Sequence, residues 1–304
     1  MQYHQLMKWK GQRRSSNIED RRGQSARSGG GRGINPILLA PLLRLLFSKK
    51  GLIIVGIFLV ISFATGNNPL NFLGQFFTGG APSQTSTPYQ GSPKENELAA
   101  FSETILASTE DVWNQLLNGY REPTLVLYTN SVNSACGFAS SATGPFYCPG
   151  DEKLYIDLSF FEDMERQLNA PGDFAQAYVI AHEVGHHIQN LMGITDEMNR
   201  LRQQVSKTEY NKYSVRLELQ ADFYAGVWAH HSQVAKQWMD QGDLQEALNA
   251  AYAIGDDRLQ KNATGKVVPD SFTHGTSEQR MRWFKKGFQS GNLRQGDTFS
   301  ANPL

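Results

Sequence analysis

The stretch His182-Glu183-Val184-Gly185-His186 combines two histidines and a glutamate at a spacing that suits metal chemistry. The flanking residues are apolar and favour a helix, in which positions four apart lie on one face, so both imidazoles can bind one ion. Zn²⁺ prefers imidazole and carboxylate ligands in a tetrahedron, and a catalytic site leaves one position for water. Glu183 can reach that water without binding the metal. The motif therefore predicts a hydrolase with one Zn²⁺ per chain.

A third ligand is expected from Glu218-Leu-Gln-Ala-Asp222, which places two acids on one face of a second helix. Like charges at this spacing repel each other, and a Zn²⁺ ion would remove that cost. We expect Glu218 to bind the metal and Asp222 to accept the free ring N–H of a ligand histidine, which fixes its tautomer. The small side chain of Ala221 would let the two helices approach closely. The alternative is a solvated acidic face.

The remaining histidines are sorted by their distance from the motif. His187 points about 100° away from His186 on a helix, so we expect a structural role for it. His230 lies about 18 Å along the axis from Glu218 if that helix continues, too far to share the ion, and His231 is no nearer. His274 and Arg280 lie around a helix start, and we predict that both stabilise the oxyanion of the transition state. The alternative is that His274 caps the turn while Arg280 pairs with a surface acid.

The charge of the chain divides it into a basic arm and an acidic body. Residues 1–50 carry eleven Lys or Arg and two acids, hence +9, and the other residues carry −9 because the 304 residues sum to zero. The first 33 residues are rich in Gly, Ser and Arg and cannot bury a core. We expect residues 1–44 to form a disordered cytoplasmic arm that meets anionic lipid, with nucleic acid as the alternative that we do not favour.

Residues 51–64 are apolar on all sides of a helix, and no charged residue occurs between Gly51 and Pro93. Residues 45–65 are therefore predicted to form a transmembrane signal anchor; the alternatives are a buried core helix or a cleavable signal peptide. The preceding positive charge predicts a cytoplasmic N-terminus and an exported body. Residues 66–93 would be a linker.

The only two cysteines, Cys136 and Cys148, are not spaced as a redox or zinc-finger pair. If the body is exported, a disulfide between them is the expected state; otherwise both stay unpaired thiols. Residues 94–304 would form the folded domain. After a predicted helix over 95–117, two predicted strands, 124–128 and 154–158, precede helices over about 173–191, 206–229 and 243–255. A last helix begins at 276 and should stop by Gly287 or Gly291, and the whole is an α+β pattern. Four capping boxes are predicted, at Asp173/Gln176, Ser206/Glu209, Asp243/Glu246 and Thr276/Gln279.

The two metal motifs resemble those of the gluzincin metallopeptidases, whose third zinc ligand is a glutamate on a second helix. The wider sequence resembles a bacterial family of neutral zinc metallopeptidases, single-pass membrane proteins of largely unassigned substrate. The stretches that carry this resemblance are Ser16–Arg22, Cys136-Gly137, Gly144–Pro149, Tyr155–Phe161, both metal motifs and His274–Arg280. The resemblance implies a zincin-like fold in which an edge strand above the metal holds a peptide, and by position we expect Leu154–Leu158 to be that strand.

These observations predict a membrane-anchored zinc endopeptidase that acts on peptide or protein substrates. In such an enzyme, Glu183 takes a proton from the metal-activated water and returns it to the leaving amine. The competing interpretation is a catalytically silent, zinc-containing membrane protein that acts as a binding or scaffold module. The presence of Glu183, which a structural zinc site does not need, favours the enzyme.

Overall fold

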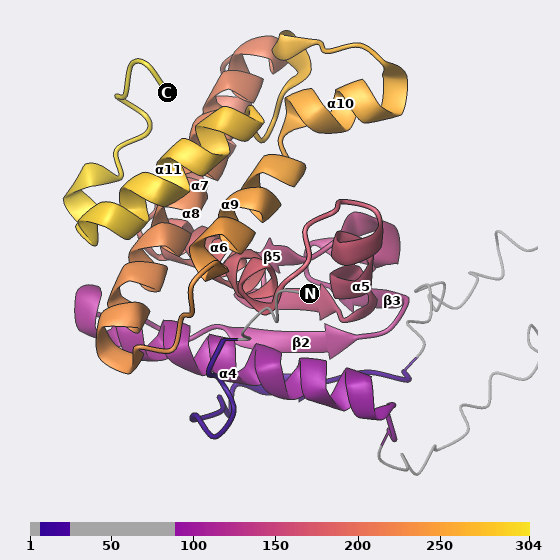
Figure 1. Ribbon diagram of the computed structural model, residues 1–304. Coiled ribbons are helices and arrows are strands. Elements are labelled where there is room, and N and C mark those ends of the chain that lie inside the picture. Colours follow the sequence, from indigo (N-terminus) through magenta and orange to yellow (C-terminus); the bar gives the residue numbers. More distant parts are fainter. Residues whose placement is uncertain (1–6, 25–88) are drawn as a thin grey trace, which may run out of the picture. The chain divides into compact units, whose positions relative to one another are not determined.

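The computed structural model describes residues 7–24 and 89–304, which show an α+β arrangement (Figure 1). The strands are β1 (Ile18–Asp20), β2 (Thr124–Tyr128), β3 (Ser131–Ser134), β4 (Gly137–Ser140), β5 (Phe146–Cys148) and β6 (Lys153–Asp157). The α-helices are α4 (Pro93–Leu116), α5 (Ser159–Arg166), α6 (Asp173–Leu191), α7 (Ile194–Arg202), α8 (Lys207–Lys236), α9 (Asp243–Ala253), α10 (Asp256–Thr264) and α11 (Ser277–Ser290). Short 3₁₀ turns occur at Ser141–Thr143, Pro269–Ser271 and Leu293–Gln295.

The main sheet has the order β1-β2-β6-β5. Strands β1, β2 and β6 are parallel, whereas β5 runs antiparallel to β6 and forms one edge. The strand predicted to be the peptide-holding edge, Leu154–Leu158, is real as β6, but it lies between β2 and β5. That expectation was wrong, because the position of a strand within a sheet depends on which segments pair with it.

Successive residues of the central strands face opposite sides of the sheet, as the pleat requires. Leu125 and Leu127 of β2 belong to the main core, which the helices complete, whereas Val126 and Tyr128 belong to a smaller core with Val132 and Ala139 of the β3–β4 hairpin. Both faces of the sheet are thus covered. A strand buried on both faces is expected to be a continuous apolar run, which Thr124–Tyr128 is apart from its first residue.

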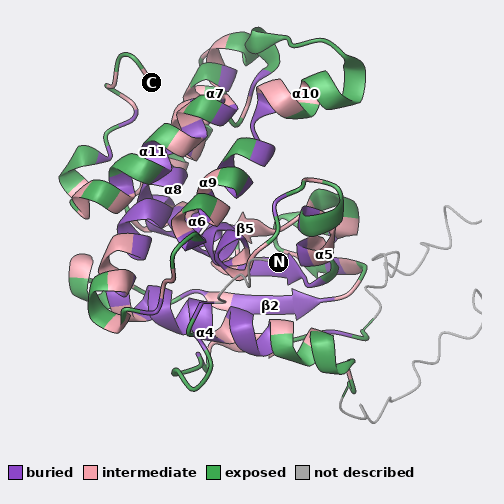
Figure 2. Ribbon diagram, viewed as in Figure 1, coloured by how far each residue is buried: buried purple, intermediate pink, exposed green. Residues whose placement is uncertain are grey.

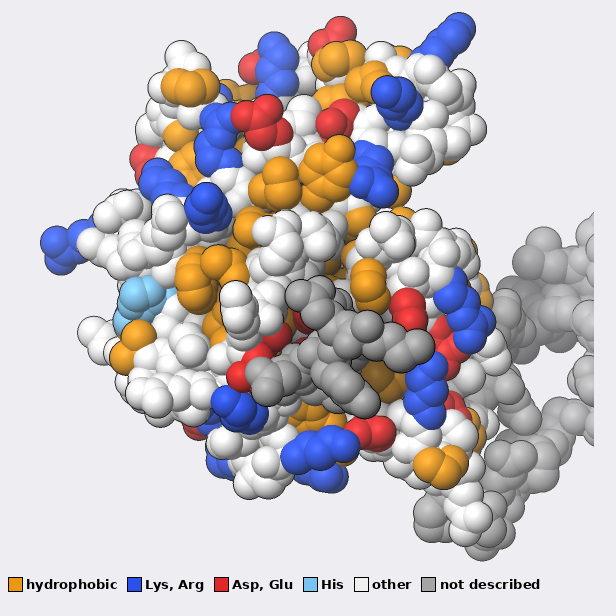
Figure 3. Space-filling view, in the orientation of Figure 1, with side chains coloured by type: hydrophobic (Ala, Val, Ile, Leu, Met, Phe, Trp, Pro, Cys, Tyr) orange, Lys and Arg blue, Asp and Glu red, His pale blue; other side chains and the backbone are white. Residues whose placement is uncertain are grey.

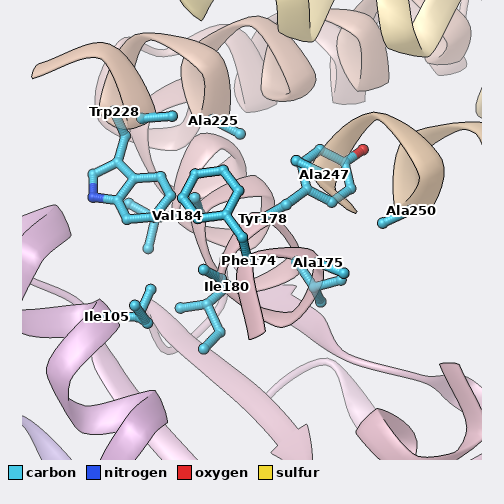
Figure 4. Packing of buried hydrophobic residues seen from close by; sticks show 14 of the residues in the cluster. Ile105, Phe174, Ala175, Tyr178, Ile180, Val184, Ala225, Trp228, Ala247 and Ala250 are labelled. Atoms are coloured by element: carbon cyan, nitrogen blue, oxygen red, sulfur yellow. The ribbon is translucent and has the colours of Figure 1, made fainter. Parts of the chain in front are cut away.

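Helix α6, which carries the H-E-x-x-H motif, runs through the middle of the main core and contacts α4, α8 and α9. The rings of Phe174 on α6 and Trp228 on α8 stack with centroids 6.0 Å apart, and Ile105 of α4 and Ala247 of α9 lie close by (Figure 4). Figure 2 shows α6 and β2 largely in the colour of buried residues, while α10 is mostly exposed. A helix buried on most sides holds its side chains in fixed rotamers, which suits a metal site.

Residues 7–24, expected to belong to a disordered arm, fold with the body instead. Strand β1 pairs in parallel with β2, joining Ile18 to Leu125. Met7 and Trp9 are buried, and the indole of Trp9 meets the ring of Phe101 edge-on at 5.4 Å. The prediction failed because the composition of the whole arm hides these few apolar residues, which bury their side chains against α4 rather than in a core of their own.

Ion pairs account for part of the basic character of the arm. Arg13 binds Glu110 of α4 at 2.9 Å, and Ser15 donates to the other oxygen of the same carboxylate at 2.5 Å. Lys8 and Lys10 pair with Asp240 and Glu97. Figure 3 likewise shows Lys and Arg side chains scattered among Asp and Glu on the visible face. The positive charge of residues 7–24 is therefore partly neutralised by the acidic body. The sequence showed that the two segments carry opposite charges, but not that they are in contact.

The predicted anchor, residues 45–65, and most of the predicted linker lie outside the described residues. Within residues 7–24 and 89–304, no helix is long and apolar enough to cross a membrane. The predicted topology placed the arm and the body on opposite sides of a membrane. Since β1 and β2 exchange backbone hydrogen bonds, residues 7–24 and the body must lie on the same side, and the division between cytoplasmic arm and exported body does not hold for residues 7–24.

This pairing predicts the outcome of a thiol-labelling experiment in intact cells. Single cysteines introduced by Gln12→Cys and Lys285→Cys, both at exposed positions, should react from the same side with a membrane-impermeant maleimide. The native cysteines form a disulfide and provide an unreactive background. Permeabilised cells serve as the control for total reactivity. Labelling of one cysteine but not the other before permeabilisation would contradict the strand pairing.

Candidate metal centre

The close crossing of α6 and α8 positions the site. A Cβ atom on Gly185 of α6 would lie 2.9 Å from the carbonyl oxygen of Ala221 on α8, closer than side chains approach a backbone. Glycine is therefore required where the two helices touch. His182 and Glu218 lie about one turn before this contact on their helices, and His186 and Asp222 come directly after it. These four side chains face each other beside the crossing. The predicted close packing through Ala221 is confirmed.

Three ligand atoms converge at this crossing as predicted. The Nε2 atom of His182 lies 3.2 Å from Glu218 Oε2, and the Nε2 atom of His186 lies 3.6 Å from Glu218 Oε1. One ligand atom from each of the three residues falls within 4.8 Å of the others. Ligands at about 2.0–2.2 Å from a tetrahedral Zn²⁺ would be about 3.4 Å apart, so this donor set fits such an ion with little adjustment.

The ring nitrogens that face away from the site are engaged in ways that leave both Nε2 atoms available. The Nδ1 atom of His182 lies 2.8 Å from Asp222 Oδ1, as predicted. The Nδ1 atom of His186 lies 2.9 Å from Gln189 Oε1, and the amide of Gln189 donates to the carbonyl of Leu217 at 2.6 Å. Each acceptor assigns the proton to Nδ1 and orients the ring. Gln189 was missed from the sequence, although its position three residues after His186 was a usable signal.

Asp222 is completely buried, and its partners keep it ionised. Burial alone would raise the pKa of its carboxyl group, but the charges of Arg280 and His182 bring the pKa down to about 2. Tyr178, which was not predicted as part of the site, donates to Asp222 Oδ1 at 2.5 Å. The acid opposite His182 is therefore an anion, and an anion is the stronger acceptor for the imidazole N–H.

Glu183 and the three ligand residues line one cleft of about 510 Å³. The cleft is bordered by Phe146 and Tyr147 of β5 and by His274 from the turn before α11. The cleft therefore contains the predicted general base and the ligand set and borders the edge strand β5. These residues come from distant segments of the chain. The size of the cleft is in the range of small-molecule and peptide sites.

His274 borders the cleft as predicted, held in place by an acid that the sequence did not reveal. The Nδ1 atom of His274 lies 3.3 Å from Asp256 Oδ1, and this hydrogen bond raises the pKa of the imidazole above its ordinary value. The other oxygen, Asp256 Oδ2, accepts the backbone N–H groups of Thr273, His274 and Gly275 at 2.7, 2.7 and 3.2 Å. One carboxylate thus shapes the turn and orients the histidine.

Arg280 lines the same cleft, with its guanidinium group paired to Asp222. It is 2% exposed, and its Nε and Nη2 atoms donate to the two oxygens of Asp222 at 2.9 and 3.0 Å. It lies at the floor of the cleft, behind His182. A cation in the first turn of a helix was expected to need a partner, and that partner is a buried carboxylate rather than a surface acid.

The other predictions for histidines and cysteines are confirmed. His187 is fully buried and contacts the hydroxyl of Tyr147 on β5 and the carbonyl of Arg121. His230 and His231 contact the carbonyls of Phe288 and Gly291, away from the ligand set. Cys136 and Cys148 form a disulfide. That bond joins the β3–β4 turn to the end of β5, so it restrains the sheet edge that borders the cleft.

Comparison with known proteins agrees with this geometry. The sequence profile of the family described as "putative neutral zinc metallopeptidase" matches residues 7–299.

The chain belongs to this family of zinc metallopeptidases. The relative "Uncharacterized protein YpfJ" of Escherichia coli (strain K12) is 49% identical over 297 residues, which cover 96% of this chain and 99% of the relative. "Uncharacterized protein Rv2575" of Mycobacterium tuberculosis is 43% identical over 207 residues, covering 65% of this chain and 69% of the relative. No solved structure matches the chain, so its likeness to the zincin fold stays a prediction.

In this member of the metallopeptidase family, the start of α6 is held by an acid from α9. Glu246 Oε2 accepts the backbone N–H of Phe174 at 3.1 Å, while Asp173, the predicted cap, makes no capping bond. The predicted box at Asp243 is also absent. The box at Thr276 is confirmed, whereas at Ser206 only the bond from the Glu209 N–H to the Ser206 hydroxyl forms. The failed caps follow glycines with positive φ, at Gly172 and Gly242, which already turn the chain into the helix.

The carboxylates of Asp173, Asp243 and Glu246 lie within 4.8 Å of one another. Burial, and then the charge of Asp243, raises the pKa of Asp173 to about 6, and burial with the charge of Asp173 raises that of Glu246 to about 7. Both values lie above the ordinary ones of 3.8 and 4.5, so the folded protein binds protons here more strongly than the unfolded chain. Proton binding at these acids therefore stabilises the folded protein fully at low pH, and this stabilisation is lost as the pH rises through 6 to 7.

We predict that Glu246→Gln reduces the fall in thermal stability between pH 5 and pH 8. The carboxamide oxygen can still accept the N–H of Phe174, but the side chain no longer ionises beside Asp173. The measurement is the midpoint of thermal unfolding across that range for both proteins, with the exposed change Glu278→Gln as control. If wild type and Glu246→Gln showed the same slope, the three acids would not be coupled as described.

Proposed function

We propose that this protein is a zinc-dependent endopeptidase. The observation that carries the proposal is the convergence of His182, His186 and Glu218 in a cleft that also contains Glu183 and borders a sheet edge. The membership of the chain in a metallopeptidase family supports it. A structural zinc site would need neither a carboxylate beside the ligands nor an open cleft, so these two features favour catalysis over a scaffold role.

The chemistry follows from the residues in the cleft. His182, His186 and Glu218 would hold a Zn²⁺ ion, which would supply a Lewis acid that lowers the pKa of water and polarises a carbonyl group. Glu183 would accept the proton of the attacking water and deliver it to the leaving amine. His274, bordering the same cleft, would donate to the oxyanion that forms. The edge strand β5 would pair with an extended peptide, and the Tyr147 hydroxyl holds this strand to His187 on α6.

We also propose that residues 7–24 and 89–304 lie outside the cytoplasm of a bacterial cell, with the apolar residues 45–65 at the membrane. The Cys136–Cys148 disulfide supports an oxidising compartment. Because β1 pairs with β2, this proposal places both described segments together in that compartment.

Two substitutions separate metal binding from catalysis. Glu218→Ala should bring the zinc content of the purified full-length protein well below one ion per chain, because it removes a ligand. Glu183→Gln should keep the zinc and lower kcat on a peptide substrate by about 10²–10⁴-fold, the usual contribution of a general base. Zinc content is measured by atomic emission, and substrates are sought by comparing cellular proteomes with wild type and Glu183→Gln. Full zinc occupancy in Glu218→Ala would remove this glutamate from the ligand set, and unchanged peptide hydrolysis by Glu183→Gln would reject the mechanism.

His274 and Asp256 are tested together through the pH dependence of the rate. His274→Ala should lower kcat and kcat/KM by a similar factor of about 10²–10³, with little change in KM. Asp256→Asn keeps an acceptor for the backbone turn but removes the charge that raises the pKa of His274. If protonated His274 is the donor, activity is lost above its pKa, so Asp256→Asn should move the alkaline limb to lower pH. A rate unaffected by His274→Ala, with only thermal stability reduced, would assign His274 to the turn alone.

A further inference from the structure

We infer that Arg280 is a positioning residue for the metal site: it holds Asp222 in the orientation that makes His182 present its Nε2 atom to the ion. The inference rests on the zinc site of the proposed function, but not on peptidase activity. It replaces the role in transition-state stabilisation that the sequence suggested for Arg280 with a role in metal binding.

The first observation is the geometry of the ion pair. Arg280 Nε donates to Asp222 Oδ2 at 2.9 Å, and Arg280 Nη2 donates to Asp222 Oδ1 at 3.0 Å. Two parallel bonds from a planar guanidinium fix the plane of the carboxylate as well as its position. A lysine, which offers a single point charge, could not impose that plane. An arginine at position 280 can therefore orient the carboxylate of Asp222 in a way that a lysine could not.

The second observation is the crowding around one oxygen. Asp222 Oδ1 lies 2.8 Å from His182 Nδ1, 2.5 Å from the Tyr178 hydroxyl and 3.0 Å from Arg280 Nη2. The hydroxyl in turn accepts from Arg280 Nη2 at 3.2 Å. Arginine and tyrosine thus hold this oxygen in a fixed place, and Arg280 Nη2 also lies 3.4 Å from His182 Nδ1. The N–H at Nδ1 of His182 donates to an oxygen whose position is fixed, and this bond orients the ring and so sets the position of its Nε2 atom.

The third observation is burial. Tyr178 and Asp222 are fully buried, Arg280 is 2% exposed and His182 is 6% exposed. A carboxylate buried this deeply depends on close hydrogen-bond partners, and Arg280 supplies two of the bonds to Asp222. Without Arg280, Asp222 would lose these bonds and its carboxylate could turn away from the histidine. Arg280 therefore keeps the carboxylate of Asp222 in place.

The fold brings Arg280 to this point by a second close helix crossing. A Cβ atom on Gly226 of α8 would lie 2.1 Å from the carbonyl oxygen of Phe284, and one on Gly287 of α11 would lie 2.1 Å from that of Phe223. The two backbones therefore approach closely, and Figure 1 shows α8 and α11 side by side. Along α8, Gly226 lies about one turn from Asp222; along α11, Phe284 lies about one turn from Arg280 and Gly287 about two. The side chains of the ion pair therefore meet inside the protein rather than at its surface.

The test separates support of the fold from support of the metal. The variants are Arg280→Met, Asp222→Asn and the double variant, made in the full-length protein, with Arg282→Met on the same helix as control because Arg282 is exposed. Two quantities are measured: the unfolding midpoint of the metal-free protein, and the Kd for Zn²⁺ in competition with a chelator. Removing one member of a buried ion pair leaves an unpaired charge, whereas removing both does not.

We expect Arg280→Met to lower the midpoint and to raise the zinc Kd by about 10–100-fold, the usual effect of losing the partner of a ligand histidine. The double variant should regain most of the midpoint but keep the weakened zinc binding, because His182 then faces a neutral amide. Arg280→Lys should fall between wild type and Arg280→Met in zinc affinity, since it restores charge without the paired bonds. Arg282→Met should match wild type in both measurements.

The inference would be overturned if Arg280→Met bound zinc with an affinity within twofold of wild type. If Arg280→Met does not fold, the same limit applies to the double variant. Arg280 would then be a purely structural residue.

Failure of the proposed function looks different. If wild type binds zinc at the predicted ligands but cleaves no peptide, the peptidase proposal fails while the positioning of His182 stands. If wild type binds no zinc at His182, His186 and Glu218, both fail, and the zinc titration of wild type alone reveals it.

Discussion

The contact between Gly185 and Ala221 brings the backbones of α6 and α8 together where the metal motifs meet. Because the helices are this close, His182, His186 and Glu218 each bring one ligand atom within 4.8 Å of the others. A methyl group at position 185 would have to push the helices apart at the crossing. Since metal–ligand bonds tolerate only a few tenths of an ångström, a larger separation would take Glu218 out of reach of an ion held by the two histidines.

The surrounding elements serve to keep that crossing rigid. The sheet and α4 support α6 from one side, while α8 and α9 enclose it from the others. Glu246 holds the first turn of α6 from α9, and His187 ties its middle to the edge strand through Tyr147. The N-terminal strand extends the sheet on the edge opposite β5. The cleft therefore lies at a boundary between the helical core and the sheet edge formed by β5.

The polar interior of the site forms a chain of partners, each fixing the next. Arg280 and Tyr178 orient Asp222, Asp222 orients His182, and Gln189 orients His186. Burying polar groups costs free energy unless each has a hydrogen-bond partner, and each side chain of this network has one. The network fixes the two imidazole rings, so that both Nε2 atoms face Glu218.

The sequence alone determined the ligand set, since the helical period fixes which side chains share a face: His182 with His186, and Glu218 with Asp222. It also determined the main helices, strand β2, the caps at Ser206 and Thr276, and the structural place of His187. The tertiary structure decided which strand is the sheet edge, that Ile18–Asp20 pairs with β2, that Glu246 caps α6, and that Arg280 faces Asp222 rather than substrate. Local spacing cannot report these features, because each joins segments far apart in the chain, and only the packing of the whole core brings such segments together.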